Sequence, residues 1–502
     1  MKNLKSIIAI AAWGLASAAT AQNLNSGYFT DGYLYRHELN PAFGNNQGYV
    51  AMPALGNLNI GMNSNLRVDN ILYNVNGKTA LFLNPQVSTS EFLSGIHDKN
   101  KITENLRLQV LGAGFKAFGG YNTIEINARQ DLDVNIPGSL LRLAKEGIEN
   151  KTYDISNFNA HAGGYAEFAL GHSRQINEKL RIGAKLKVLL GIANLDADFK
   201  KAQLTLGEDK WVGITDAEIQ TSIKSMKYEI EETERGPEGE ENTHRYVSGL
   251  DIDSWGINGF GLAFDLGAEY KLDKNWAFSA SVLDLGYIGW SNNYVASTNG
   301  ERQISTDRYI FNVDEDASNS FENEADRLME GLSALYELQD NGDTGSRSRA
   351  LAATMNIGVQ YTPDFYDKLS FGLLNSTRMA GKYSWTEFRL SANVAPAKIF
   401  SASANMALGT YGTSFGWLLN FHPNGFSCIH CLGCNLYVGF PGCKYQNCVN
   451  IRVSKNFLII SCAKWCRSIS VHHLLNVFFD SVLIIIANGN NIYIVKQHND
   501  FN

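Results

Sequence analysis

Seven cysteines have the clearest capacity for chemistry in this sequence, and all of them lie near its end. They stand at Cys428, Cys431, Cys434, Cys443, Cys448, Cys462 and Cys466. The Cys-x-x-Cys-x-x-Cys spacing at the start of this series suits an iron–sulfur cluster or zinc, but the proline-terminated continuation of the ferredoxin pattern is missing. An odd number of cysteines also fits a disulfide framework poorly. We therefore predict no cofactor and no metal site here.

Two glycine patterns have the spacing of catalytic or nucleotide-binding motifs. Gly412–Gly416 has the Gly-x-Ser-x-Gly spacing of a nucleophile elbow, which requires a helix after the serine. The residues that follow it alternate as in a strand instead. Gly112–Ala117 fits a dinucleotide-binding pattern, but no helix begins after it, and glycines in a crowded barrel wall explain it better. We predict that the chain is not an enzyme.

Histidines and acidic residues give no metal-binding spacing either. The histidines that precede the cysteine-rich part are scattered, at His37, His97, His161, His172 and His244. No two of them have the spacing of zinc ligands. The acidic clusters 314–316 and 340–343 offer calcium-type oxygens, but neither continues into a complete binding loop. We interpret both clusters as solvated loops.

The elements that must position these residues are strands, as the period of the hydrophobic pattern indicates. Phe260–Lys271 alternates large apolar residues with small or charged ones, and Trp276–Val282 does the same after the short link Leu272–Asn275. This pattern is typical of a hairpin with one apolar and one polar face. Similar alternation recurs in 124–129, 180–188, 355–361, 388–394, 400–408 and 415–421.

The lengths of the connections favour a membrane barrel over a secreted soluble β-protein, which is the alternative. Short links at 175–179, 272–275, 362–368 and 395–398 are separated by long insertions at 196–255 and 291–350. Periplasmic turns are short and extracellular loops long in outer-membrane barrels. We predict an all-β fold, a transmembrane antiparallel β-barrel of about 14 strands. Apolar residues at helical spacing in 319–341 predict a helix within the second insertion.

Residues 1–21 have the features of a secretory signal. Lys2 and Lys5 precede the apolar run Ile7–Ala16, and small residues at Ala19–Ala21 suit a signal peptidase. The run is too short to span a bilayer. We expect an exported protein whose mature chain starts near Gln22, located in the outer membrane of a Gram-negative bacterium.

The stretch Tyr33–Phe43, with the sequence Tyr-Leu-Tyr-Arg-His-Glu-Leu-Asn-Pro-Ala-Phe, resembles the start of an uncharacterised family of Bacteroidota outer-membrane barrels, a domain of unknown function. The resemblance covers about 22–425 and implies an outer-membrane location without an assigned activity. Asn40, Pro41 and Ala42 also resemble a triplet of the long-chain fatty-acid transporter superfamily, whose N-terminal region forms a plug inside the barrel. That resemblance implies a plug-like segment, in which Pro41 fixes a turn through its restricted φ.

The alternation stops after His422–Gly425, where another turn is expected. The apolar run Leu474–Ala487 that appears later is interrupted by polar residues and too short to span a membrane. We interpret 426–502 as the product of a reading-frame shift near Gly425, with a genuine appended domain as the alternative. A barrel without its closing strands has an unpaired edge in lipid, so this product would assemble poorly. The predicted organisation is a signal peptide (1–21), a plug-like segment (22–56), a barrel (57–425) and an aberrant tail (426–502).

The leading functional hypothesis is a channel or transporter for small or hydrophobic molecules. Its partners would be outer-membrane lipid and small hydrophobic solutes. Nucleic acid is not expected as a partner, because the net charge is −7 and no basic stripe is present. The second hypothesis is a surface scaffold, or a component of a secretion or attachment complex, that transports nothing.

Overall fold

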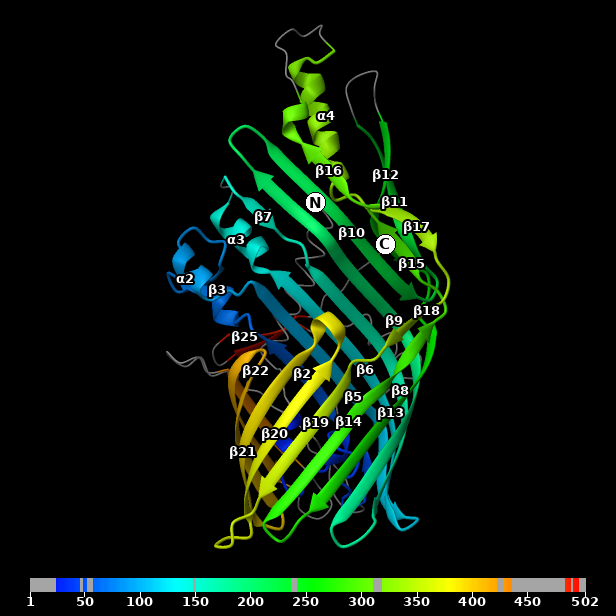
Figure 1. Cartoon of the computed structure of the whole chain (residues 1–502), viewed down its shortest axis with the longest axis vertical. Helices are drawn as coiled ribbons and strands as arrows, with labels where there is room; N and C mark the ends of the chain where they lie inside the picture. The colour runs from blue at the N-terminus through cyan, green and yellow to red at the C-terminus, as the bar shows by residue number, and fades with distance from the viewer. Residues whose placement is uncertain are drawn as a thin grey trace.

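The fold of the chain is seen in a computed structural model that describes residues 24–45, 48–51, 57–147, 150–235, 242–309, 318–421, 428–435, 484–488 and 491–495. The predicted signal peptide lies outside these residues, as does most of the predicted tail. Long antiparallel strands form a tall, curved wall whose tight hairpins lie at the lower end in Figure 1. The all-β antiparallel barrel predicted from the alternation is confirmed.

Among the described residues, thirteen strands follow one another around this wall, each paired antiparallel with the next. In spatial order they are β2 (Leu58–Ser64), β5 (Lys99–Ala117), β6 (Gly120–Pro137), β8 (Asn159–Gln175), β9 (Leu180–Leu206), β13 (Gly259–Lys271), β14 (Trp276–Trp290), β19 (Ala353–Tyr361), β20 (Leu369–Met379), β21 (Trp385–Ala397), β22 (Phe400–Gly409), β23 (Gly412–Phe421) and β24 (Cys428–Asn435). The short β1 (Tyr49–Ala51), which falls within the predicted plug-like segment, also pairs with β5. The Thr103 hydroxyl on β5 and the Tyr411 hydroxyl, in the turn between β22 and β23, lie 2.7 Å apart.

The alternation of side chains explains why these segments form a two-faced wall. On β13, Phe260 and Leu266 point outward and are 58% and 54% exposed, whereas Ala263 and Asp265 point inward and are 0% and 1% exposed. Successive residues of a strand face opposite sides of a sheet, so one apolar and one polar surface result.

The four predicted short links all join neighbouring wall strands, and in Figure 1 they lie at the lower end. The two predicted long insertions rise from the upper end (Figure 1). They are built largely from paired strands, namely the upper half of β9, β10 (Trp211–Ile223), β11 (Met226–Arg235), β12 (Asn242–Ile252), β15 (Tyr294–Ser297), β16 (Arg302–Ser305), β17 (Gln339–Asp343) and β18 (Arg347–Ala350). The short helix η4 (Thr306–Arg308) lies between β16 and the predicted helix.

The predicted helix of the second insertion is confirmed as α4 (Phe321–Ala334), which begins after Ser320, whose side chain accepts a hydrogen bond from the Asn323 amide. A second group of small elements flanks the upper wall, at the left of Figure 1. It comprises η3 (Val68–Asn70), β3 (Leu72–Val75), β4 (Lys78–Leu81), α2 (Thr89–Ser94), α3 (Gly138–Glu146) and β7 (Thr152–Asp154). Phe82 and Phe92 stack at 4.3 Å in its core. No described helix has both the length and the apolar character needed to cross a membrane.

The lumen of the barrel holds the start of the described chain, residues 24–45, which we call the inner segment. It contains η1 (Leu24–Gly27) and η2 (Arg36–Glu38), and it touches inward-facing residues of strands from β5 to β22. The short helix η5 (Gly381–Tyr383) joins β20 to β21. In the predicted tail, β24 continues the wall, and β25 (Ile484–Asn488) pairs with β26 (Asn491–Val495).

Candidate functional site

The inner segment is anchored to the wall by Asn40, the first residue of the predicted plug motif. Its fully buried side-chain nitrogen donates to the carbonyl oxygens of Ala268 on β13 and Ala280 on β14, both at 3.2 Å. Its side-chain oxygen accepts the Ala42 amide at 2.9 Å. Buried polar groups are costly unless paired, so this amide specifies one seat on the wall.

Glycines in the wall allow the inner segment to come this close. A Cβ at Gly267 would collide with the Asn40 side-chain oxygen, and a Cβ at Gly183 would collide with the backbone of Pro41. Glycine in a strand often marks a close approach of another backbone. The structure thus brings Asn40, Pro41 and Ala42 together against β9, β13 and β14.

Aromatic side chains fill the lumen around this anchor. The ring of Tyr28 meets Phe29 and Phe43 edge to face, at 4.9 and 5.1 Å. The Arg36 guanidinium lies 4.3 Å above the Phe43 ring. Such pairs add to the stability gained by burying the rings, so the inner segment is packed rather than loosely threaded.

A group of ten ionisable residues, which we call the lower charge cluster, joins the inner segment to the wall. Its members are His37, Glu38, Arg107, Glu125, Arg129, Glu167, Lys185, Lys187, Asp265 and Asp284. Glu125 is central, because it lies 2.7 Å from the His37 ring, 3.1 Å from Lys185 and 3.2 Å from Arg107. Four cations thus face five carboxylates with one histidine, and they are held side by side inside the barrel.

His37, Glu38 and Glu125 offer ligand atoms within 4.8 Å of one another, which is the geometry of a metal-binding group. The neighbouring cations argue against that role. Arg107 pairs with both Glu38 and Glu125, and Lys185 pairs with Glu125. A divalent ion would have to displace or repel these cations, so we interpret the group as part of the ion-pair network.

Sequence reasoning missed this cluster because its members are far apart in the chain. His37 and Glu125, for example, are separated by 88 residues. The available signal was weak: each charged residue stands alone on the inward face of an alternating strand. That pattern predicts a polar interior without naming partners.

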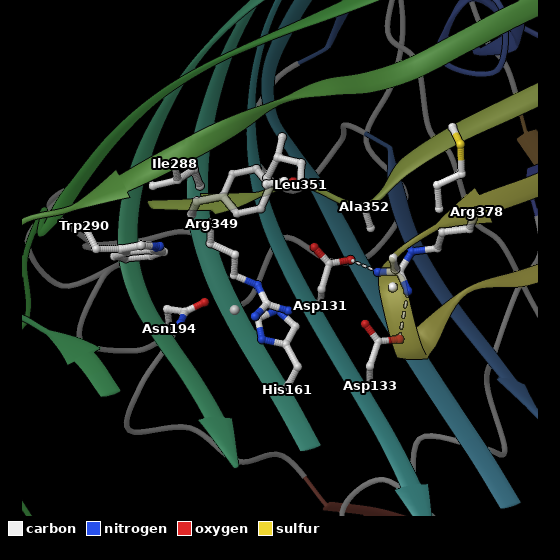
Figure 2. Close-up of a pocket in the computed structure, with 16 residues that line it drawn as sticks. Asp131, Asp133, His161, Asn194, Ile288, Trp290, Arg349, Leu351, Ala352 and Arg378 are labelled. Carbon is white, nitrogen blue, oxygen red and sulfur yellow. Dashed lines mark hydrogen bonds and ion pairs between the residues drawn. The ribbon is translucent and has the colours of Figure 1, made fainter. Parts of the chain in front are cut away.

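Two adjoining cavities lie inside the barrel, and residues of the inner segment line the lower one. The lower cavity, of about 150 Å³, is lined by Glu38 and Leu39 and by wall residues that include Arg107 and Lys187. The upper cavity, of about 160 Å³, lies between the charged side chains of Figure 2 and the apolar Ile288, Trp290 and Leu351. The cavities share five lining residues and therefore adjoin. These are Asp131, Tyr165, Leu351, Ala352 and Arg378.

Two arginine-centred groups stand at the upper cavity. Arg378 donates to Asp133 at 2.8 Å and lies 3.5 Å from Asp131, as the dashed lines in Figure 2 mark. Arg349 contacts Asp196 at 2.5 Å, and His161 contacts the same carboxylate at 3.0 Å.

Two tyrosines near the rim of this region keep their protons at neutral pH. Burial, together with the charges of Asp196 and Asp133, raises the pKa of the Tyr383 hydroxyl well above its usual range. Burial likewise raises the pKa of Tyr411, to about 12. Both hydroxyls are therefore neutral rather than anionic under ordinary conditions.

The two glycine patterns weighed in the sequence lie on wall strands. Gly112–Ala117 belongs to β5, where a Cβ at Gly114 would collide with the side chains of Tyr49 and Tyr121. Gly412–Gly416 belongs to β23 and pairs with β22. Neither pattern opens a helix. The cluster 340–343 lies on β17, where Asp340 and Asp343 accept backbone amides of Gly342, Asn293 and Gly345.

Residues 41–429 match the model of a family of unknown function, DUF5723. The chain belongs to this family. Among curated proteins, none matches the sequence of this DUF5723 chain. The prediction that the chain belongs to a family of unknown function is confirmed.

Several solved structures share a limited likeness with this DUF5723 chain. The toluene transporter TbuX of Ralstonia pickettii is 8% identical, with 84% of this chain and 93% of that chain covered and a TM-score of 0.36. The toluene transporter TodX of P. putida is 9% identical, with 83% and 89% covered and a TM-score of 0.37. The monoaromatic hydrocarbon channel CymD is 10% identical, with 79% and 92% covered and a TM-score of 0.24.

Proposed function

We propose that this protein is an outer-membrane barrel that passes small solutes through its lumen, with the inner segment as a plug. The observation that carries the proposal is the pair of adjoining cavities, the lower of which is lined in part by the inner segment. They extend from Glu38 and Leu39 in that segment to Arg349 and Trp290 in the upper lumen. Asp131, Tyr165, Leu351, Ala352 and Arg378 line both cavities, so a solute would pass between these side chains.

The outer face of the wall supports the membrane location. Large apolar side chains stand exposed on strand after strand, as Phe264, Leu285, Phe371, Phe388 and Met406 illustrate. Soluble proteins rarely expose contiguous apolar patches of this extent. Lipid would cover them, while the charged interior stays away from the hydrocarbon.

A mobile plug is consistent with the contacts of the inner segment, because those described between it and the wall are all non-covalent. Asn40 binds two strand carbonyls, and Ser281 and Asn356 donate to the Leu39 carbonyl at 2.8 and 3.0 Å. Each such hydrogen bond contributes about 1 kcal/mol net. Loss of the Asn40 hydrogen bonds should therefore weaken the attachment of the segment to the wall.

The cavities also indicate which solutes fit. The upper cavity presents Ile288, Trp290 and Leu351 on one side, which suits a small hydrophobic part. Its size limits the solute, since a cavity of about 150 Å³ holds a molecule as large as benzene. We propose small solutes with at least one apolar group.

Reconstitution of the full chain in liposomes tests this function. Solute-driven swelling or single-channel steps are expected, and Asn40→Ala should increase them by loosening the segment. Asn242→Ala, in the exposed β12, is the matched control and should leave both unchanged. A barrel that folds and stays sealed to every small solute, with or without Asn40→Ala, would refute transport.

A second function is favoured by the two long insertions, 196–255 and 291–350, which rise above the wall and which we call the upper extension. On α4, Met329 and Tyr336 just after it are 62% and 70% exposed, above the upper end of the wall. Exposed large apolar side chains on a folded extension suit a protein-binding surface. A surface scaffold would remain sealed in liposomes and would lose its partners when Met329 and Tyr336 are both changed to Ser.

A further inference from the structure

We propose that the upper cavity is a binding site for a small zwitterion with an apolar side chain, a molecule of the α-amino-acid type. The proposal rests on the transport function above and names its solute class. It is carried by a juxtaposition: Arg349 with His161, and Arg378 with Asp131 and Asp133, line the same cavity, together with apolar side chains.

The first group has an excess of positive charge. One carboxylate, that of Asp196, is shared by Arg347 at 2.6 Å, by Arg349 at 2.5 Å and by His161 at 3.0 Å. Two guanidinium groups against one carboxylate leave one positive charge uncompensated within this group. Of these residues, Arg349 and His161 line the cavity, whereas Arg347 and Asp196 do not. This side of the cavity can therefore receive a carboxylate.

The second group is richer in carboxylates. One guanidinium, that of Arg378, is shared by Asp133 at 2.8 Å and Asp131 at 3.5 Å. Two carboxylates share one guanidinium here, and the positive charges of Arg129 and Lys101 also act on Asp131 and Asp133, respectively. Thr103 donates one further hydrogen bond to Asp133, at 2.8 Å, which adds no charge. This side can receive an ammonium group.

The two groups line one cavity but have not joined into a single network. Arg349 and His161 stand on one side of Figure 2, and Arg378 with its two aspartates on the other. Opposite charges in a medium of low dielectric attract strongly, and each pays a desolvation penalty while unpaired. A zwitterion placed between them would pair with both groups at once.

The rest of the cavity lining suits a ligand that carries an apolar side chain next to a hydrogen-bond acceptor. The six-membered part of the Trp290 ring packs where Gly191 and Gly259 have no side chains. The indole Nε1 is buried, has no hydrogen-bond partner among the described residues, and in Figure 2 is turned toward the centre of the lining group. It can donate to a ligand carboxylate, while Ile288 and Leu351 cover the ligand's apolar part.

The cavity volume of about 160 Å³ sets the size of the ligand. A cavity of about 150 Å³ holds benzene, so a molecule with roughly six to nine non-hydrogen atoms fits here. Leucine satisfies the size, the two charges and the apolar branch. It is the probe that we choose.

The test measures equilibrium binding of radiolabelled leucine to the purified full chain in detergent micelles. Competition with 4-methylpentanoate, which lacks the ammonium group, and with 3-methylbutylamine, which lacks the carboxylate, should each be at least tenfold weaker than with leucine. This comparison needs no variant and is independent of any folding defect. Equal competition by either analogue, or no saturable leucine binding, would overturn the proposal.

Two variants then assign the binding to the cavity. Arg349→Gln and Asp131→Asn should each weaken leucine binding at least tenfold, whereas Lys274→Gln, at the exposed link between β13 and β14, should not. Unchanged binding in both folded cavity variants would also overturn the proposal. Liposome flux separates the two hypotheses: leucine that binds without crossing refutes transport alone, and solutes that cross without any preference for zwitterions refute this inference alone.

Discussion

The lower charge cluster and the upper cavity contain the same kinds of residues arranged in different ways. Around Glu125 the charges touch directly, and His37 of the inner segment is one of the contacts. Around the upper cavity, two groups of ion pairs face an open space. Both regions hold direct ion pairs and both border a cavity, but the lower charges bind the inner segment, whereas the upper ones face the apolar side chains of Ile288, Trp290 and Leu351. The two regions differ in how their side chains pack, since both are built from similar kinds of residues.

Removing a charge from the lower cluster should have the largest effect on stability. Arg107→Gln leaves Glu38, Glu125 and Glu167 with one cation fewer, and breaking a buried network of this kind costs about 3–5 kcal/mol. The measurement is urea unfolding of the barrel in micelles, followed by its heat-dependent shift on a gel. Lys274→Gln removes an exposed ion pair and should leave unfolding unchanged. Equal stability of the two variants would contradict the stabilising role of the cluster.

Crowding the seat of the inner segment should have the next largest effect. Gly267→Ala places a Cβ against the Asn40 side chain, and overpacking of this kind costs about 1–3 kcal/mol. We expect faster solute flux and easier proteolysis of the inner segment. Gly289→Ala is the matched control, because the atom nearest to its added Cβ, the Phe260 carbonyl oxygen, would lie 3.6 Å away. Identical flux and proteolysis in the two variants would show that the seat is not the restraint.

The same arginine substitution at the upper cavity should be much milder. Arg349→Gln leaves Asp196 paired with Arg347 and His161, so the loss of unfolding free energy should be about 1 kcal/mol or less. The urea unfolding measured for Arg107→Gln gives the direct comparison. A loss as large as that of Arg107→Gln would mean that both regions serve only to hold the barrel together.

The last expected effect is a pH dependence at the rim, which is absent at neutral pH and confined to alkaline conditions. The pKa of Tyr411 is raised to about 12 by burial, above the value of about 10 in an unfolded chain. The folded state then holds this proton more tightly, so its contribution is complete below about pH 10 and disappears as the pH rises toward 12. Tyr411→Phe should make the loss of stability between these pH values shallower. An identical pH profile for the variant would contradict the burial of this hydroxyl.

The sequence predicted much of the wall because alternation is a local property. The strands around 260–282 and 400–421, the four short links and the helix of the second insertion follow from period and turn composition alone. The paired strands of the upper extension were harder to predict. Their partners, such as β10 against β15 and β16, lie far along the chain, and their sequences alternate less regularly.

The candidate site was likewise predicted only in its local features and not in its long-range contacts. The sequence singled out Asn40, Pro41 and Ala42 through a resemblance, but not the carbonyls of Ala268 and Ala280 that hold the Asn40 amide. Glu125, Arg107 and Lys185 each appeared as one polar residue among many inward-facing ones.

By itself, then, the sequence determined that strands with an apolar and a polar face would form, because side-chain direction follows residue number along each strand. Only the tertiary structure decided which charges would touch and which would face a cavity. Those relations depend on strand register, on the curvature of the wall and on the seat of the inner segment, and all three join residues that are distant in the chain.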